Sequence, residues 1–140
     1  MISARVHYAA LALTELAIRQ SGKSPVTIRE ITARHGIPGP FLVQILRTLR
    51  SVGWVQSVRG SQGGYRLLVE PSEITLLEIA EAVGCQDSSC QTETTETRAD
   101  QLLHEFWSQA AEASRALLAQ TSLAEIAADA SQGDEVMFYI

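Results

Sequence analysis

Hydrophobic side chains recur every three to four residues over most of the chain, and strict alternation is confined to two short segments. The first helical stretch covers residues 3 to about 20 and begins at Ser3, a residue type favoured as an N-cap. Its apolar stripe comprises Val6, Ala10, Leu13 and Ala17. Alternation typical of strands occurs at residues 54–58 and 65–69. The pattern therefore predicts a mainly α fold with one small β-hairpin.

Two short helices joined by a tight turn are predicted before this hairpin. Thr27 and Glu30 form a capping box that opens the first helix, and Gly36 supplies a left-handed stop near residue 35. After the turn, Gly39 is expected as N-cap and Pro40 at the first helical position. The apolar face of the second helix, which we expect to be buried, comprises Phe41, Leu42, Ile45, Leu46, Leu49 and Val52. Followed by a hairpin, this pair predicts a winged helix-turn-helix.

The outward face of the second helix carries side chains suited to duplex DNA. Gln44 and Arg47 are expected nearest the bases, because glutamine can form two hydrogen bonds with adenine and arginine can do so with guanine. Further DNA contacts are expected from Arg29, Pro40, Phe41 and Val43.

The hairpin tip is rich in glycine and begins with an arginine. Its sequence, Arg59-Gly60-Ser61-Gln62-Gly63-Gly64, has three glycines in six residues, which lets the backbone approach a sugar-phosphate chain or a minor groove. Arg59, Ser61 and Gln62 are therefore candidate DNA contacts. An ordinary glycine-rich hairpin is the alternative interpretation.

Charge is divided unevenly along the chain. The net charge of −5 by itself argues against nucleic acid as a partner. However, residues 1–66 hold nine lysines and arginines against two acidic residues, a net charge of +7. Residues 67–140 hold two against fourteen, a net charge of −12. This asymmetry predicts a basic half that meets phosphate and an acidic half that faces elsewhere.

The hairpin and its flanking segments resemble a known family. Gly53-Trp54-Val55 precedes the glycine-rich run that ends at Tyr65, and Ile74-Thr75-Leu76-Leu77-Glu78-Ile79-Ala80-Glu81-Ala82-Val83 follows it. With these motifs the chain resembles the Rrf-two family of bacterial regulators over nearly its whole length, from Tyr8-Ala9 into a long late helix. The resemblance implies a cytoplasmic, homodimeric transcription regulator that binds a double-stranded DNA operator and often carries an iron–sulfur cluster.

Both cysteines lie in a polar segment, residues 85–97, that is expected to be a sensor loop. Four residues separate Cys85 from Cys90, and no apolar side chain anchors the segment, so a metal or cluster would give it a fixed shape. Thiolates select iron–sulfur clusters, and imidazole can replace thiolate on one iron. Three interpretations stay open from these residues: a cluster, a reversible disulfide or small-ligand sensing without a cluster, and cysteines without a role.

The resemblance adds two histidines to this candidate metal site. His104 matches by position a histidine ligand of the family, and His7 stands where related sensors have a carboxylate that reaches the partner's cluster. Gln101 occupies the position of a usual third cysteine, which argues against a cubane held by three thiolates. The resemblance therefore implies a [2Fe–2S] cluster held by Cys85 and Cys90 together with His104 or the partner subunit's His7. A lone helical histidine is nevertheless more often a surface or packing residue.

Two capping boxes and two apolar stretches organise the second half. A box at Thr75 and Glu78 opens a short helix that Gly84 closes. A long helix follows from about residue 97 to 120, with an apolar stripe of Leu103, Phe106, Trp107, Ala110, Ala113 and Leu117. We expect this stripe to pack on a second copy about a two-fold axis and to set two recognition helices one DNA turn apart; packing within one chain is the alternative for part of it. A box at Ser122 opens a last short helix, and residues 136–140 are predicted to form a strand-like apolar tail.

These elements divide the chain into three expected parts. Residues 1–84 form the winged helix-turn-helix, residues 85–97 the cysteine-containing loop, and residues 98–140 the dimerisation helix and tail. No apolar run is long enough to span a membrane and no signal peptide is evident, so we expect a cytoplasmic protein without a membrane partner. No acid–base pair, nucleophile elbow or nucleotide loop is present, so no enzyme is expected.

Overall fold

The structure, a computed structural model of the chain, describes residues 2–20, 22, 24–60, 63–84 and 97–138. These residues form six α-helices, a short 3-10 helix and a two-stranded antiparallel sheet. The predicted fold class, mainly α with a small β-hairpin, is therefore confirmed. None of the helices in this part of the chain is long and apolar enough to cross a membrane.

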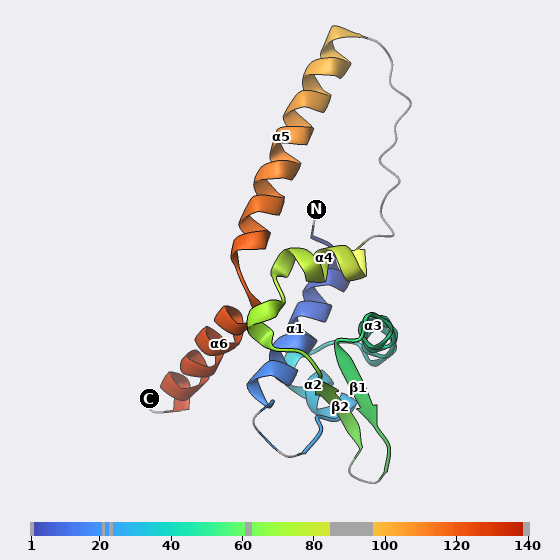
Figure 1. The fold of residues 1–140 in the computed structure, drawn as a ribbon, viewed down its shortest axis with the longest axis vertical. Coiled ribbons are helices and arrows are strands. Elements are labelled where there is room, and N and C mark those ends of the chain that lie inside the picture. Colours follow the sequence, from blue (N-terminus) through green and yellow to red (C-terminus); the bar gives the residue numbers. More distant parts are fainter. Residues whose placement is uncertain (1, 21, 23, 61–62, 85–96, 139–140) are drawn as a thin grey trace.

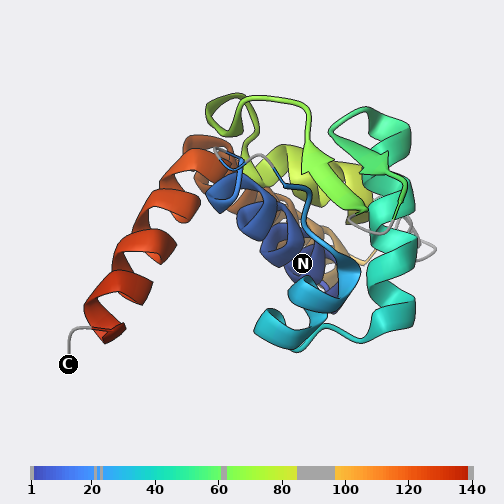
Figure 2. The ribbon, with the colours of Figure 1, turned by 90° about the horizontal axis from the view of Figure 1, so that it is seen from below.

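The N-terminal helix α1 (Ala4–Ile18) lies at the centre of the molecule (Figures 1 and 2). Ser3 caps it as predicted, accepting a hydrogen bond from the Val6 amide. Helices α2, α3, α4 and α6 and strand β2 all contact α1, so its buried face is wider than the single predicted stripe. The residues buried on α1 are Val6, Ala9, Ala12, Leu13, Thr14, Glu15 and Leu16.

Helices α2 (Ile28–His35) and α3 (Gly39–Val52) form the predicted helix-turn-helix. Both bonds of the capping box between Thr27 and Glu30 are present, and Gly36 ends α2 with a left-handed φ of 66°. The expected start of α3 was wrong by one residue: Pro38 is the N-cap, and Pro40 is the second helical residue. This shift is tolerated because neither of the first two helical amides has a partner within the helix.

The buried face of α3 is narrower than predicted. Leu42, Ile45, Leu46 and Leu49 are buried, but Phe41 is 54% exposed and Val52 is 45% exposed. These two residues lie at opposite ends of the helix, beyond the part that the core covers. Phe41 instead faces Tyr8 of α1, with ring centroids 6.4 Å apart.

Strands β1 (Val55–Val58) and β2 (Gly64–Leu67) form the wing, with Val55 paired to Leu67 and Val58 to Gly64. The backbone of the Ser24–Val26 linker also pairs with the sheet, because Val26 and Tyr65 exchange two hydrogen bonds of 3.0 and 2.8 Å. A Cβ atom on Gly64 would collide with the Val26 carbonyl. One of the tip glycines is therefore required for close packing of the wing onto the linker before α2.

After the 3-10 helix (Pro71–Glu73), helix α4 (Leu76–Gly84) leads to the cysteine segment, of which residues 85–96 lie outside the described residues. Helix α5 (Arg98–Gln120) then projects away from the rest of the molecule, and α6 (Leu123–Phe138) returns to contact α1 (Figure 1). The capping boxes at Thr75 and Ser122 are both formed.

The prediction of a strand-like tail was wrong. Helix α6 continues to Phe138, so residues 136–138 of the predicted tail are helical, and residues 139–140 lie outside the described part of the chain. A short apolar run does not by itself distinguish a strand from the end of a helix. Here the alanine-rich stretch before it favours helix, because alanine has the highest helix propensity.

Candidate nucleic-acid interface and sensor site

The predicted base-contacting residues lie together on the outer face of α3. Gln44 and Arg47 are exposed, Val43 is half-buried beside them, and Pro40 and Phe41 are exposed at the start of the helix. Leu42, Ile45, Leu46 and Leu49 fix the opposite face in the core. The hydrophobic pattern therefore determines which side chains α3 presents outward, as the sequence predicted.

The wing lies beside α3 (Figure 2). Arg59 is exposed at the end of β1, and Gly60 follows with a φ of 121°. The other two predicted wing contacts, Ser61 and Gln62, lie outside the described residues. Arg29 is exposed on the first turn of α2. Two of the elements that contact α3 thus each carry an exposed arginine: Arg29 on α2 and Arg59 at the end of the first wing strand.

A buried carboxylate that the sequence interpretation missed holds α2 against α1. Glu15 is 1% exposed, and its oxygens lie 3.5 Å from Arg19 Nε, 3.2 Å from Arg34 Nε and 3.2 Å from His35 Nε2. A buried charge is costly unless it is paired, and here two of the three partners, Arg34 and His35, come from the last turn of α2. The signal in the sequence was a glutamate between Leu13 and Leu16, inside the apolar run of α1.

The other end of α2 is tied to the same helix. Arg19 Nη1 lies 3.2 Å from Glu30 Oε2, and the same carboxylate accepts the Thr27 amide at 2.9 Å. The hydrogen bond from the Thr27 backbone, aided by Arg19, lowers the pKa of Glu30 from its ordinary value. Together with Glu15, these contacts fix both ends of α2 on α1.

The four candidate cluster ligands are only partly within the described structure. Cys85 and Cys90 lie outside it. His104 is half-buried on α5, with Nε2 3.4 Å from Asp100 Oδ1, and His7 is exposed on α1 beside Tyr8, at a ring-centroid distance of 6.3 Å. Among the described residues, no three His, Cys, Asp or Glu side chains are grouped closely enough to hold a metal ion.

One contact bears on the relation between His7 and the cysteine segment. Gly84, the last residue before Cys85, packs so closely on Val6 that an added Cβ would lie 3.1 Å from Val6 Cγ2. Val6 is the residue before His7. The start of α1 therefore lies against the end of α4, where the cysteine segment begins.

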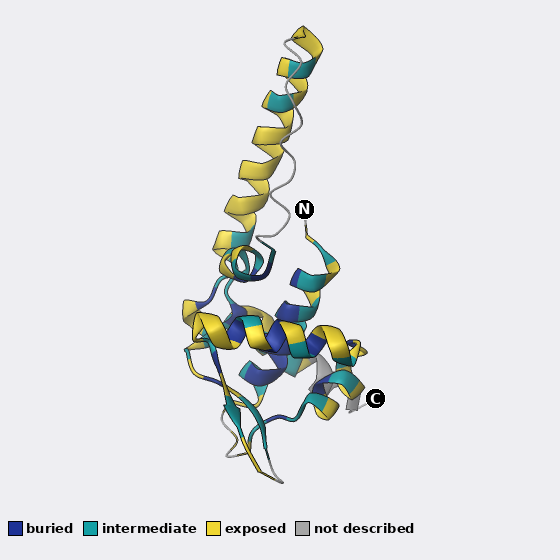
Figure 3. Cartoon of the chain, turned by 90° about the vertical axis from the view of Figure 1, so that its right-hand side faces the viewer, coloured by how far each residue is buried: buried dark blue, intermediate teal, exposed yellow. Residues whose placement is uncertain are grey.

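The apolar stripe of α5 is uncovered. No described residue of this helix is buried, and Figure 3 shows exposure along nearly its whole length. The largest exposed side chains are Leu103 (50%), Phe106 (64%), Trp107 (63%) and Leu117 (65%). Every side chain of the predicted stripe is exposed, so the expectation that part of it packs within one chain was wrong for the described residues. The Arg115 guanidinium of the same helix does reach Glu81 of α4 at 2.9 Å.

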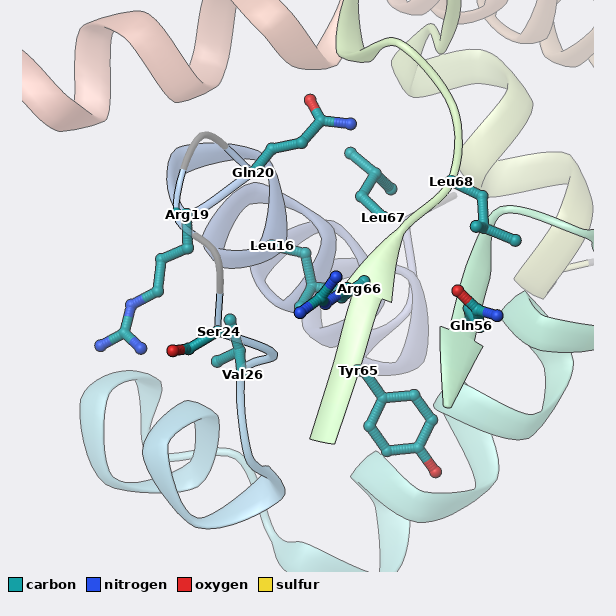
Figure 4. A pocket seen from close by; sticks show the side chains of 11 residues that line it. Leu16, Arg19, Gln20, Ser24, Val26, Gln56, Tyr65, Arg66, Leu67 and Leu68 are labelled. Carbon is teal, nitrogen blue, oxygen red and sulfur yellow. The ribbon is translucent and has the colours of Figure 1, made fainter. Parts of the chain in front are cut away.

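A cavity of about 300 Å³ opens between the end of α1, the linker before α2 and strand β2 (Figure 4). Leu16 and Val26 form part of its apolar wall, and Arg19 and Arg66 are among its polar lining residues. No residue predicted as a DNA contact or cluster ligand lines it. The cavity is thus separate from the outer face of α3.

Comparison with known proteins places the chain in a family. Residues 2–129 match the model of the Rrf2 (Rrf-two) family, described as an iron-dependent transcriptional regulator. The transcriptional regulator IscR of Vibrio atlanticus is 34% identical over 134 residues, which cover 91% of this chain and 75% of that protein. The chain spans little more than half, 54 to 57%, of the length of three further curated regulators.

Two solved structures share the fold. T. potens IscR has a TM-score of 0.75 and 29% sequence identity, with 95% of this chain and 90% of that chain covered. CymR (YrzC), the global cysteine regulator of B. subtilis, also has a TM-score of 0.75 and 29% identity, with 91% and 96% covered. These relatives are named as regulators rather than enzymes, in agreement with the sequence-based expectation. The match over residues 2–129 shows that the chain belongs to the Rrf2 family of transcriptional regulators.

Proposed function

We propose that this chain is a cytoplasmic, homodimeric, sequence-specific DNA-binding transcription regulator. The observation that carries the proposal is the outer face of α3, where Gln44 and Arg47 are exposed on a helix whose other face is fixed in the core. Both side chains can form paired hydrogen bonds with base edges in a major groove. Val43, Pro40 and Phe41 extend this face along the helix and supply apolar contacts.

Exposed arginines that lack an ion-pair partner among the described residues support phosphate binding by α3 and its neighbouring elements. Arg29, Arg47, Arg50 and Arg59 are exposed and form no ion pair with other described residues, whereas Arg19 and Arg115 are paired with glutamates. Each phosphate that a protein neutralises on duplex DNA changes the slope of log K against log salt by about −0.9. If Arg29, Arg50 and Arg59 of each subunit met phosphate while Arg47 met bases, a dimer would show a slope of roughly −5.

The test is selection of duplexes from a random pool, followed by binding to the selected operator over a range of salt concentrations. The proposal predicts enrichment of a two-fold related sequence and a steep salt dependence. A scrambled duplex of equal length is the control for non-specific affinity. Absence of any enriched sequence, together with affinity that does not change with salt, would contradict the proposal.

The dimer is proposed from the uncovered stripe on α5. A 23-residue helix is about 34 Å long, and apolar side chains exposed along it require a partner in water. A second copy fits, because a two-fold axis lets the same stripe cover itself and gives the two recognition helices the symmetry of a palindromic operator.

The sensing mode proposed is a [2Fe–2S] cluster held by Cys85 and Cys90 with histidine completing the set. Two thiolates and one or two imidazoles form a donor set that suits such a cluster, and the partner subunit's His7 is one candidate for an imidazole ligand. His104 is the other candidate, and its distance of 3.4 Å to Asp100 is suitable for orienting the imidazole. The bound cluster would supply a one-electron redox couple.

The chain's own residues would convert the state of that site into a change in DNA affinity. The segment between α4 and α5 joins the end that packs on α1 to the helix proposed to form the dimer. A change in what Cys85 and Cys90 bind would favour one arrangement of α5 over another, and with it one separation of the two wings. The size of this effect is set by how much more favourable the bound state is in one arrangement than in the other.

The test is an absorption spectrum with iron and sulfide analysis of anaerobically purified protein. About two irons per subunit and a red-brown colour are expected for a [2Fe–2S] centre. Cys85→Ala and Cys90→Ala should abolish the colour, while His7→Ala and His104→Ala identify which imidazole contributes. Colourless wild-type protein without iron would contradict the cluster while leaving the DNA-binding proposal intact.

A second sensing mode is a reversible disulfide between Cys85 and Cys90, or binding of a small ligand, on the same dimer. It is supported by the equal likeness of the fold to IscR and to the global cysteine regulator CymR, both with a TM-score of 0.75. An oxidant-dependent loss of two free thiols, reversed by dithiothreitol and accompanied by altered operator affinity, would favour this mode.

A further inference from the structure

Arg5 links α1 to the recognition helix by a side-chain hydrogen bond. Its Nη2 donates to Thr48 Oγ1 at 3.2 Å, across 43 positions of sequence. The Thr48 hydroxyl in turn donates to the Gln44 carbonyl at 3.2 Å. A chain of two hydrogen bonds thus connects Arg5 to the backbone of a residue proposed to contact bases.

The Arg5 side chain is poorly suited to a packing role alone. Its Nε is buried and has no hydrogen-bond acceptor among the described residues. A buried donor without an acceptor destabilises a fold, and an apolar side chain of similar length would fill the same space without that cost. The presence of a guanidinium at this position is therefore better explained by its hydrogen bond to Thr48 than by the volume that it fills.

The surroundings of Arg5 place it where three helices meet. Arg5 contacts α3 through Thr48, and its neighbour Val6 packs against Gly84 at the end of α4. Helix α3 also contacts both α1 and α4 directly. The apolar contacts hold α3 in this position, and the hydrogen bond from Arg5 adds a directed restraint to this non-directional packing.

We propose that Arg5 is a positioning residue that fixes the rotation of α3 through Thr48, and thereby sets the base preference of Gln44 and Arg47 without itself contacting DNA. The inference rests on the proposed function of α3. A bidentate base contact requires both of its hydrogen bonds to be short and nearly linear, so a small rotation of α3 weakens discrimination between bases. Non-specific attraction to phosphate has no such requirement.

The experiment compares Arg5→Met, Thr48→Val, the double variant and Arg5→Lys. Each is titrated with the operator selected by the wild type and with a scrambled duplex, over a range of salt concentrations. Arg98→Met removes an equal charge from α5 and is the matched control. Circular dichroism and thermal unfolding establish that each variant is folded, and Thr48→Val, which keeps the side-chain shape, tests the inference even if Arg5→Met does not fold.

The expected result is a fall of about tenfold in the preference for operator over scrambled duplex, near the low end of what one bidentate contact contributes. Affinity for scrambled DNA and the salt slope should stay at the wild-type values, and Arg5→Lys should restore part of the preference. The double variant should lose no more than the stronger single variant, because both changes break the same chain of bonds.

Three results would overturn the inference. The first is wild-type discrimination by folded Arg5→Met and Thr48→Val. The second is additive losses in the double variant, and the third is a salt slope that falls by about 1 in Arg5→Met, which would indicate that Arg5 contacts phosphate. A wild-type protein that prefers no duplex at all would instead overturn the proposed function on which the inference rests.

Discussion

Truncation of Phe106 tests the proposed role of α5 in dimerisation. The side chain is 64% exposed in one chain, and an aromatic side chain has roughly 200 Å² of surface, so about 130 Å² is open to a partner. Alanine would remove about 100 Å² of this in each subunit, or about 200 Å² in the dimer. At about 25 cal/mol per Å², the upper limit of the loss is about 5 kcal/mol. Because association recovers only part of such burial, we expect about 2 to 4 kcal/mol.

A loss of this size would raise the dimer dissociation constant about 30- to 1,000-fold. Sedimentation equilibrium over a range of protein concentrations measures it directly. Ser108→Ala is the matched control, since Ser108 lies two residues away on the opposite side of α5 and should leave the constant unchanged. A dissociation constant of Phe106→Ala within twofold of the wild type would refute the assignment of this stripe to the dimer.

Three further predictions concern the stability of the winged helix-turn-helix. The pKa of Glu30 is lowered in the folded protein, so the ionised carboxylate stabilises the fold above its ordinary pKa of 4.5, and this stabilisation is lost as the pH falls through the folded pKa. In urea unfolding, the difference in the free energy of unfolding between wild type and Glu30→Gln should therefore shrink in acid. Glu15→Gln should lower the free energy of unfolding in urea by about 1 to 2 kcal/mol, less than the about 3 to 5 kcal/mol typical of an unpaired buried charge, because the Arg19 and Arg34 side chains that it leaves are 41% and 44% exposed to water; an unfolding curve equal to that of the wild type would refute the role of Glu15. Gly64→Ala should lower the free energy of unfolding by about 1 to 3 kcal/mol through collision with the Val26 carbonyl, whereas Gly39→Ala, which has open space, should not; equal unfolding curves would refute this account.

The starts of α2, α4 and α6 were predictable because their signals are local. A capping box needs only residues three apart, and the boxes at Thr27, Thr75 and Ser122 all form as the sequence predicts. The same holds for the outward placement of Gln44 and Arg47, which follows from helical periodicity within α3.

Features that depend on contacts between distant segments were not predictable in the same way. Periodicity assigned Phe41 and Val52 to the core, but burial at the ends of a helix depends on how far neighbouring elements extend. Two partners of Glu15, Arg34 and His35, lie about 20 residues away on α2, and the hydrogen bond from Arg5 spans 43 positions. Neither pairing has a local sequence signal, because each arises only when the helices pack.

The central claim is that α3 recognises DNA sequence, and binding of Arg47→Met to operators with single base-pair changes tests it most directly. The proposal predicts that wild type loses about 1 to 3 kcal/mol at each contacted base pair. Arg47→Met should bind the unchanged operator less tightly and become indifferent to substitution at one symmetry-related pair of positions, while retaining the other preferences. A variant that keeps the wild-type preference at every operator position would contradict recognition through this face of α3.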